Sequence, residues 1–297
     1  MSRLNPQQQL AIKAIDRPLL VLAGAGSGKT TVITHKIFHL VKERDVQPKH
    51  IFAVTFTNKA AREMKERAAK QLKGDAGKGL NVSTFHNLGL NIIRREHQQL
   101  GIKPNFSIFD AHDGLTLIKE LIPNAENIDK ELVYFIQHQI SNWKNAMIDP
   151  EQALNLSANG NQMLAAKVYQ RYNRQLRAYN AVDFDDLILL PTELFRTNPE
   201  ALDRWQNRIR YLLVDEYQDT NASQYLLVKL LVGVRQAFTV VGDDDQSIYA
   251  WRGAVPENLA RLQEDFPGLE VIKLEQNYRS SRRILKAANQ LISNNPH

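Results

Sequence analysis

The strongest constraint on the fold is a continuous stretch, LLVLAGAGSGKTTVITHKI, that begins at Leu19. Its first five residues are apolar and predict a buried strand, while Val32, Ile33 and Ile37 recur at helical spacing. The glycine-rich segment between them predicts a tight turn. A strand that turns directly into a helix points backbone N–H groups at one place, where they can hold phosphate oxygens. The stretch therefore predicts an α/β fold with a phosphate-binding loop, in preference to a chance glycine-rich turn.

The residues of this loop divide by chemistry. The glycines permit the turn, Lys29 supplies a positive charge, and Thr30 offers a hydroxyl to Mg²⁺. The full phosphate-loop pattern has a glycine where this chain has Ala23, which we interpret as a tolerated variant. We expect the nucleotide to be held by the consecutive residues Ala23, Gly24, Ala25, Gly26, Ser27, Gly28, Lys29, Thr30 and Thr31.

Further apolar runs predict strands at 51–56, 211–214, 238–241 and 269–274, and all five strands are expected to be buried on both faces. Helical patterns between the early runs predict a parallel sheet covered by helices. From about residue 84 to 196 amphipathic stretches occur without a convincing strand, which indicates a helical insertion. The 297-residue chain is thus predicted to hold a sheet domain (1–84 and 197–275), a helical subdomain (85–196), and the start of another domain (276–297).

Two of the predicted strands run into polar chemistry. The strand in YLLVDEYQDT ends at Asp215, which could hold Mg²⁺, and Glu216, which could take a proton from an attacking water. The alternative is an acidic turn in which Asp219 or Thr220 caps the next helix.

The segment FTVVGDDDQSIYAWRGA leads to Gln246, whose amide can bond both water and a phosphate. Tyr249, Trp251 and Arg252 follow Gln246 in the sequence, and this combination suits stacking on unpaired bases. The alternative is that Tyr249 and Trp251 are ordinary core aromatics.

Composition narrows the function classes. The chain has no cysteine, no signal-peptide core and no apolar run long enough for a membrane span, so disulfides, thiolate metal sites and a spanning helix are excluded and cytoplasmic residence is predicted. Residues 1–80 hold 15 basic and 6 acidic side chains. This local excess hints at a polyanionic partner, with a merely solvated surface as the alternative.

Eight segments occur in an order that we recognise: LNPQQ, AGAGSGKT, TFTNKAAREMKER, STFHNLG, DFDDLILLP, LLVDEYQD, VVGDDDQSIYAWRGA and LEQNYRSS. On these segments the chain resembles superfamily 1 DNA helicases of the UvrD/Rep type over nearly its whole length. The resemblance implies a RecA-like P-loop NTPase motor domain (1A type) with a parallel sheet, interrupted by a mostly α-helical insertion subdomain (1B type). It also implies that residues 276–297 begin a second motor domain (2A type).

The resemblance also implies roles for single residues. Gln8 would read the adenine edge, Tyr278 would stack on adenine, and Arg279 would reach the γ-phosphate, a task that suits the fixed charged fork of arginine. It repeats the roles inferred above for Lys29, Thr30, Asp215, Glu216 and Gln246. The residues implied to contact DNA are Phe56, Thr57, Asn58, Phe85, His86, Phe184, Tyr249, Trp251 and Arg252. Asp185 and Asp186 could cap the following helix and receive no chemical role.

On this resemblance we interpret the chain as the N-terminal portion of an ATP-dependent DNA helicase or translocase. Its cofactors would be ATP and Mg²⁺, and its partners single-stranded DNA, ss/dsDNA junctions and replication or repair proteins, with movement from 3′ to 5′ and no membrane. Two alternatives stay open: a half-motor that binds nucleotide and single-stranded DNA without turnover, and the motor of a helicase–nuclease complex. The pathway, the partner proteins and the oligomeric state are not determined by the sequence.

Overall fold

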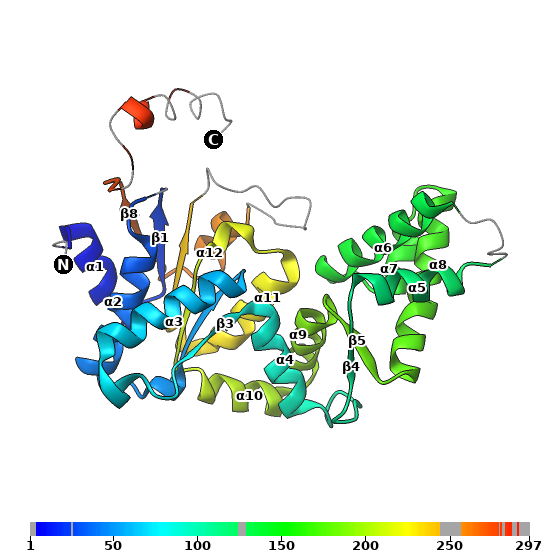
Figure 1. Cartoon of the computed structure of the whole chain (residues 1–297), viewed down its shortest axis with the longest axis horizontal. Coiled ribbons are helices and arrows are strands. Elements are labelled where there is room, and N and C mark those ends of the chain that lie inside the picture. The colour runs from blue at the N-terminus through cyan, green and yellow to red at the C-terminus, as the bar shows by residue number, and fades with distance from the viewer. Residues whose placement is uncertain are drawn as a thin grey trace. The chain divides into compact units, whose positions relative to one another are not determined.

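The computed structural model describes residues 4–24, 26–123, 129–243, 257–278, 280, 283–286 and 290 (Figure 1). The chain divides into two compact units. We call the first, Met1–Thr84 with Trp205–Thr220 and Val232–His297, the sheet unit. The second, Phe85–Arg204 with Asn221–Leu231, is called the helical unit.

The sheet unit is built on six strands in the order β3-β2-β6-β7-β1-β8, and every pairing is parallel. In chain order they are β1 (Leu19–Ala23), β2 (Ile51–Thr55), β3 (Asn81–Thr84), β6 (Tyr211–Val214), β7 (Phe238–Gly242) and β8 (Glu270–Leu274). The predicted α/β fold with a parallel sheet is confirmed. Because all strands run the same way, the residues that follow β1, β2, β6 and β7 emerge at one edge of the sheet.

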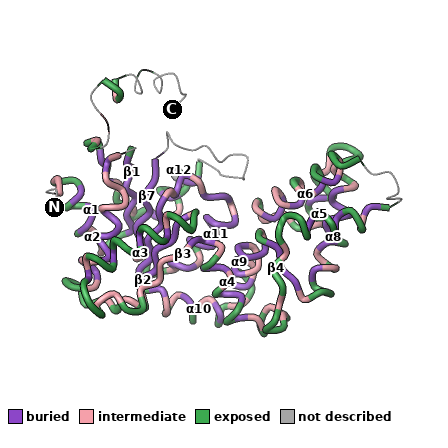
Figure 2. Tube along the Cα trace, in the orientation of Figure 1, coloured by how far each residue is buried: buried purple, intermediate pink, exposed green. Residues whose placement is uncertain are grey.

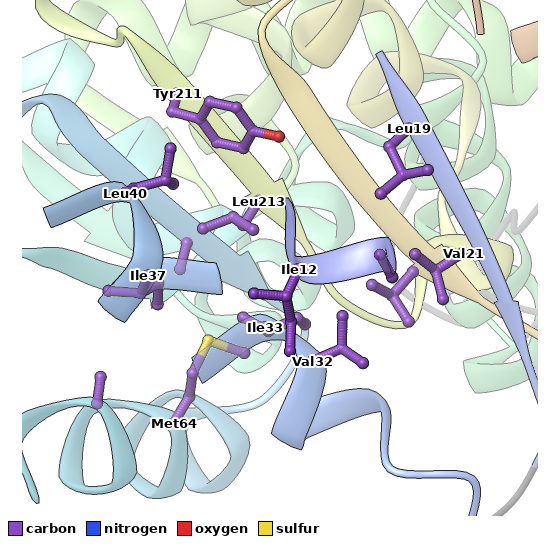
Figure 3. Close-up of a cluster of buried hydrophobic side chains, with 14 of the residues drawn as sticks. Ile12, Leu19, Val21, Val32, Ile33, Ile37, Leu40, Met64, Tyr211 and Leu213 are labelled. Atoms are coloured by element: carbon purple, nitrogen blue, oxygen red, sulfur yellow. The ribbon is translucent and has the colours of Figure 1, made fainter. Parts of the chain in front are cut away.

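Burial is greatest in the central strands, where nearly every residue is apolar (Figure 2). One core cluster gathers side chains from the sheet and from three helices, α1 (Pro6–Lys13), α2 (Lys29–Lys42) and α3 (Asn58–Leu72). Figure 3 shows side chains of this cluster from all four elements, among them Ile12 of α1, Ile37 of α2, Met64 of α3 and Leu213 of β6. The sheet unit also contains α12 (Asn258–Asp265) and the short 3-10 helices η1 (Pro48–His50), η2 (Gly74–Gly77), η4 (Tyr217–Asp219) and η5 (Gly233–Arg235).

Two expectations for the sheet were wrong. Strand β8 lies at an edge and exposes Glu270 and Lys273, so it is not buried on both faces. The opposite edge strand, β3, was not predicted, because Asn81, Ser83 and Thr84 give it a polar sequence without an apolar run. Edge strands are covered less completely than central ones, which is why polar residues are tolerated in both.

The helical unit contains α4 (Phe85–Glu96), α5 (Ala111–Leu121), α6 (Lys130–Asn145), α7 (Pro150–Leu156), α8 (Gly160–Ala178) and α9 (Asp186–Thr197). Its core includes Trp143 of α6 stacked on Tyr169 of α8, with ring centroids 5.9 Å apart. Strands β4 (Ser107–Phe109) and β5 (Ala181–Asp183) form a small parallel pair, so the expectation of a segment without strands was wrong. Runs of three residues are too short to carry a recognisable alternation.

The chain returns to the sheet unit within α10 (Pro199–Arg208), and α11 (Ala222–Val232) belongs almost wholly to the helical unit. The predicted boundary had placed the return at residue 197 and left 221–231 in the sheet domain. Hydrogen bonds tie this segment to the helical unit: Asn221 Nδ2 donates to Asn145 Oδ1 (3.1 Å) and Thr192 Oγ1 donates to the Ser223 carbonyl (3.5 Å). Within the described ranges, no helix combines the length and the apolar character that crossing a bilayer requires.

Candidate nucleotide-binding site

The glycine-rich loop leaves β1 and enters α2 in the conformation that its glycines permit. Gly26 (φ 75°) and Gly28 (φ 92°) both occupy the left-handed region. The Ser27 hydroxyl donates to the Gly24 carbonyl over 2.7 Å, which closes the turn. Helix α2 starts at Lys29 with no side-chain cap and no acidic residue in its first turn. Its N-terminal N–H groups and the positive end of its dipole are therefore suited to an anion.

Helix α1 holds this loop from one side. Gln8 is buried, donates from Nε2 to the Ser27 carbonyl (3.1 Å), and closes a capping box with Asn5. A Cβ on Gly28 would meet Gln8 Nε2 at 2.6 Å, so the end of the Gln8 side chain would have to shift, and the φ of 92° favours glycine independently. Tyr278 joins the same group, since its backbone N–H donates to the Gly26 carbonyl (2.9 Å) and its hydroxyl accepts from Asn5 Nδ2 (2.8 Å).

On the other side of the loop lies the acidic end of β6. Lys29 Nζ donates to Glu216 Oε2 over 3.1 Å, an ion pair between residues 187 positions apart. Glu216 sits in the left-handed region (φ 50°), and Gln218 Nε2 donates to the same carboxylate oxygen (2.8 Å). The amide oxygen of Gln218 accepts from the Asp243 N–H (3.0 Å), so Gln218 links the ends of β6 and β7.

The second acid of this strand end is held by backbone bonds. The Glu216 N–H donates to Asp215 Oδ1 (2.9 Å), and the Asp215 N–H donates to the Val54 carbonyl (2.9 Å). Burial raises the pKa of Asp215 to about 6; the charge of Glu216 adds to this rise and Lys29 opposes it. The same causes raise the pKa of Asp219 to about 6. Within the described residues, Asp219 Oδ1 is buried without a hydrogen-bond partner.

The alternative in which Asp219 or Thr220 caps the next helix is wrong. Asn221 does so instead: its Oδ1 accepts from the Gln224 N–H (2.9 Å), while Gln224 Oε1 accepts from the Asn221 N–H (3.0 Å). The Thr220 hydroxyl donates to the Tyr217 carbonyl. Among the described residues, Asp219 thus keeps a buried carboxylate oxygen without a hydrogen-bond partner, and the charge of Glu216 acts on it.

The predicted DNA-contacting residues fall in both units. In the sheet unit, Thr57 caps α3 by accepting from the Ala60 N–H (3.1 Å), next to the half-buried Phe56 and the exposed Asn58. In the helical unit, Phe184 is 51% exposed and meets the His86 ring edge to face, with centroids 6.3 Å apart. Phe85 differs from this expectation, because its side chain is only 1% exposed and belongs to the core rather than to a stacking surface.

Several predicted site residues lie outside the described residues: Ala25, Gln246, Tyr249, Trp251, Arg252 and Arg279. Of the remaining nucleotide-site residues, the structure brings Gln8, the loop, Lys29, Asp215, Glu216 and Tyr278 together in one unit.

Sequence reasoning missed Asn5 and Gln218, whose bonds join the parts of this site. The asparagine before Pro6 and the glutamine two places after Glu216 were visible, but short polar side chains in turns are too common to single out.

Comparison with known proteins places this chain in a family. Residues 4–267 match the UvrD/REP helicase N-terminal domain. The chain is 61% identical over 295 residues to the ATP-dependent DNA helicase Rep of Escherichia coli (strain K12), covering 99% of this chain and 44% of that protein. It is 48% identical over 298 residues to the ATP-dependent DNA helicase PcrA of Staphylococcus aureus (strain Mu50 / ATCC 700699), covering 99% and 40%.

Among solved structures, the Pif1 helicase from Candida albicans matches with a TM-score of 0.42 and 13% identity, over 98% of this chain and 44% of that one. The chain spans less than half the length of the Rep and PcrA relatives. The family match covers most of the chain and confirms the resemblance drawn from the ordered motifs. The chain belongs to the UvrD/REP helicase N-terminal domain family.

Proposed function

We propose that this chain is the ATP-binding and DNA-contacting part of an ATP-dependent DNA helicase or translocase that moves on single-stranded DNA. The observation that carries the proposal is the ion pair between Lys29 of the glycine-rich loop and Glu216 at the end of β6. It joins a phosphate-binding element to an acid suited to activate water, within one rigid sheet edge. The names of the Rep and PcrA relatives support the same activity.

The loop residues 23–31 would bind the nucleotide phosphates through backbone N–H groups and Lys29. The hydroxyl of Thr30 and the carboxylate of Asp215 would hold Mg²⁺, which neutralises phosphate charge when bound. The donor set fits such an ion: Asp215 and Asp219 both have raised pKa values, and Asp219 Oδ1 has no hydrogen-bond partner among the described residues. A cation beside these acids would relieve the cost of their buried charge.

The adenine would lie against the half-exposed Tyr278 ring. Gln8 already uses its Oε1 on the Asn5 N–H and its Nε2 on the Ser27 carbonyl. One amide N–H and one lone pair of Gln8 remain for the adenine edge.

Hydrolysis would begin with an exchange of partners. A bound phosphate draws the Lys29 ammonium away from Glu216, which keeps its hydrogen bond from Gln218 Nε2. The freed carboxylate then accepts a proton from the attacking water. Gln246 and Arg279 are proposed to contact the γ-phosphate and to stabilise the charge that develops there.

Single-stranded DNA would be held by aromatic stacking and by polar contacts to its backbone, neither of which requires a particular sequence. Phe56 with Thr57 and Asn58, and Phe184 with His86, are the described candidates, and Tyr249, Trp251 and Arg252 complete the set. We do not propose base stacking by the buried Phe85 ring. Movement from 3′ to 5′, a second motor domain, action at ss/dsDNA junctions, cytoplasmic residence and a role in replication or repair stay predictions.

The test is ATP hydrolysis by the 297-residue chain with Mg²⁺, with and without oligo(dT), for the wild type and Glu216→Gln. Glu264→Gln is the matched control, because this exposed glutamate lies on α12 of the same unit. We expect DNA-stimulated hydrolysis that Glu216→Gln abolishes and Glu264→Gln keeps, with nucleotide binding retained in both. Binding of a fluorescent ATP analogue without hydrolysis would favour the half-motor, and no binding at all would overturn the proposal.

A further inference from the structure

A second polar cluster lies entirely in the helical unit. Lys144 of α6 has a fully buried side chain, and its Nζ donates to Asp183 Oδ2 (2.8 Å) and Asp186 Oδ1 (2.9 Å). Tyr172 of α8 donates its hydroxyl to Asp183 Oδ2 (3.0 Å). Three helices and β5 therefore meet on one ammonium group.

The two aspartates also lock the turn that they flank. The Asp183 N–H donates to Asp186 Oδ2 (3.1 Å), and the Asp186 N–H donates to Asp183 Oδ1 (2.9 Å). Every carboxylate oxygen of the pair thus accepts a hydrogen bond. Asp183 and Asp186, rather than Asp185 and Asp186, form the reciprocal cap of α9, and Asp185 makes no side-chain capping bond.

The cluster sets one ammonium against two carboxylates. Burial opposes the charge on Lys144, but the attraction of Asp183 and Asp186 raises its pKa well above the usual range. Burial and the charge of Asp183 raise the pKa of Asp186 to about 6. Removing one partner of such a buried cluster is costly, because it leaves a buried charge uncompensated.

The locked turn presents one residue to solvent. Phe184 stands between the two aspartates and leaves about half of its apolar surface in water, where it gains little from the hydrophobic effect. Its described ring contact is the edge-to-face approach of His86 at 6.3 Å. The reciprocal bonds between Asp183 and Asp186 constrain the backbone on both sides of this exposed ring.

We propose that Lys144, Tyr172, Asp183 and Asp186 form a positioning cluster that holds the Phe184 ring exposed, so that a base of single-stranded DNA can stack on it. This inference rests on the proposed function, because it takes Phe184 to be a DNA contact. The cluster residues touch no DNA and act only through the turn. A merely structural role for the cluster would instead weaken DNA binding equally whether or not Phe184 is present.

The experiment measures the affinity of the 297-residue chain for fluorescein-labelled (dT)16 by anisotropy, at constant salt. Asp186→Asn and Tyr172→Phe are compared with wild type, each also in a Phe184→Ala background. Tyr169→Phe is the matched control, because it removes a hydroxyl from the same helix whose bond goes to the Ile148 carbonyl. Urea unfolding verifies that each variant is folded, and Tyr172→Phe alone carries the test if Asp186→Asn does not fold.

We expect Phe184→Ala to weaken binding roughly tenfold, as loss of one stacked base does. Asp186→Asn and Tyr172→Phe should weaken binding in the wild-type background, and neither should add anything to Phe184→Ala, while Tyr169→Phe leaves affinity unchanged. Wild-type affinity in Phe184→Ala, or no binding by any form, would overturn the DNA contact and this inference with it. A loss in Phe184→Ala with full affinity in the cluster variants, or equal losses in both backgrounds, would overturn the positioning role alone.

Discussion

Each unit contains a lysine held by carboxylates, and the two arrangements differ in ways that fit different tasks. Among the described residues, Lys29 pairs with one carboxylate, that of Glu216, whose side chain is 37% exposed. Lys144 has two, and its own side chain has no exposure at all. A lysine that must exchange its partner for a ligand needs an accessible pair that costs little to break. A lysine that fixes a turn is served by buried partners that it cannot leave.

The pKa values of Asp183 and Asp215, one acid from each cluster, also differ. Burial would raise the pKa of both Asp183 and Asp215, but the attraction of Lys144 together with the hydrogen bonds from Lys144, the Asp186 N–H and Tyr172 holds the pKa of Asp183 below its ordinary value. Asp215 feels Lys29 only weakly, and its pKa rises to about 6. Lys144 thus favours the charged form of Asp183, while Asp186 of the same cluster shares with Asp215 a pKa raised to about 6 by burial and by a neighbouring acid.

Among the substitutions that test this comparison, Lys144→Met should have the largest effect on stability. Removing the ammonium leaves two buried carboxylates without their counter-charge, and breaking such a pair costs ~3–5 kcal/mol of unfolding free energy. Urea unfolding at neutral pH measures this loss, with the exposed Lys167→Met on α8 as control. A loss under about 1 kcal/mol would mean that the cluster is no more coupled than a surface ion pair.

A second test compares one glycine from each unit instead of the charged residues. A Cβ on Gly89 of α4 would run into the Leu187 carbonyl oxygen, whereas a Cβ on Gly28 would meet only the end of the Gln8 side chain. Gly89→Ala must push backbone apart and should cost ~1–3 kcal/mol or more. Gly28→Ala should cost less, mostly for its positive φ. Gly160→Ala has open space and serves as control in thermal unfolding; equal losses at positions 28 and 89 would contradict the distinction.

The parts of this structure that depend on neighbours in the sequence could be predicted. The loop before Lys29 and the acids after β6 can be recognised because strand, turn and helix follow one another within a few residues. Parallel strands then bring both segments to one edge of the sheet. The ion pair from Lys29 to Glu216 follows from that logic although 187 residues separate the partners. The order of the strands in the sheet does not follow from this logic, so the edge position of β8 could not be predicted.

The parts that depend on distant packing could not be predicted. Lys144 lies 39 residues before Asp183, in an amphipathic helix whose pattern says nothing about which polar residue turns inward. The same limit applies to Phe85, which its motif marks as a DNA contact but which α4 directs into the core. Burial of one residue is set by what packs against it, and one sequence does not contain that information in local form.

A third lysine extends the comparison, because it should make the stability of the chain depend on pH. Lys36 of α2 is fully buried, yet its Nζ donates to the carbonyls of Ala11 (2.7 Å) and Ala14 (2.6 Å) rather than to a carboxylate. Burial lowers its pKa to about 7, although Glu270 opposes the shift.

Between pH 7 and about 10.5 the unfolded chain therefore binds a proton at Lys36 that the folded chain lacks, and stability should rise with pH by up to ~1.4 kcal/mol per pH unit. Urea unfolding at pH 7, 8 and 9 measures this slope. Lys36→Met should reduce the slope and the exposed Lys42→Met should not. Equal slopes in all three proteins would show that Lys36 titrates as an ordinary lysine.

The smallest effect on stability is expected from Lys29→Met, which is also the sharpest contrast with Lys144→Met. The pair with Glu216 is partly exposed, and pairs of this kind contribute ~0–1 kcal/mol. Its loss leaves Glu216 with the Gln218 bond and access to water. Stability without nucleotide should therefore stay within about 1 kcal/mol of wild type, while the increase in melting temperature caused by Mg²⁺-ATP disappears, because a ligand stabilises only the fold that binds it. If Lys29→Met destabilised the chain as much as Lys144→Met, the two lysines would be alike and the ion pair at the glycine-rich loop would be structural. If instead it kept the full response to nucleotide, Lys29 would not contact the phosphates.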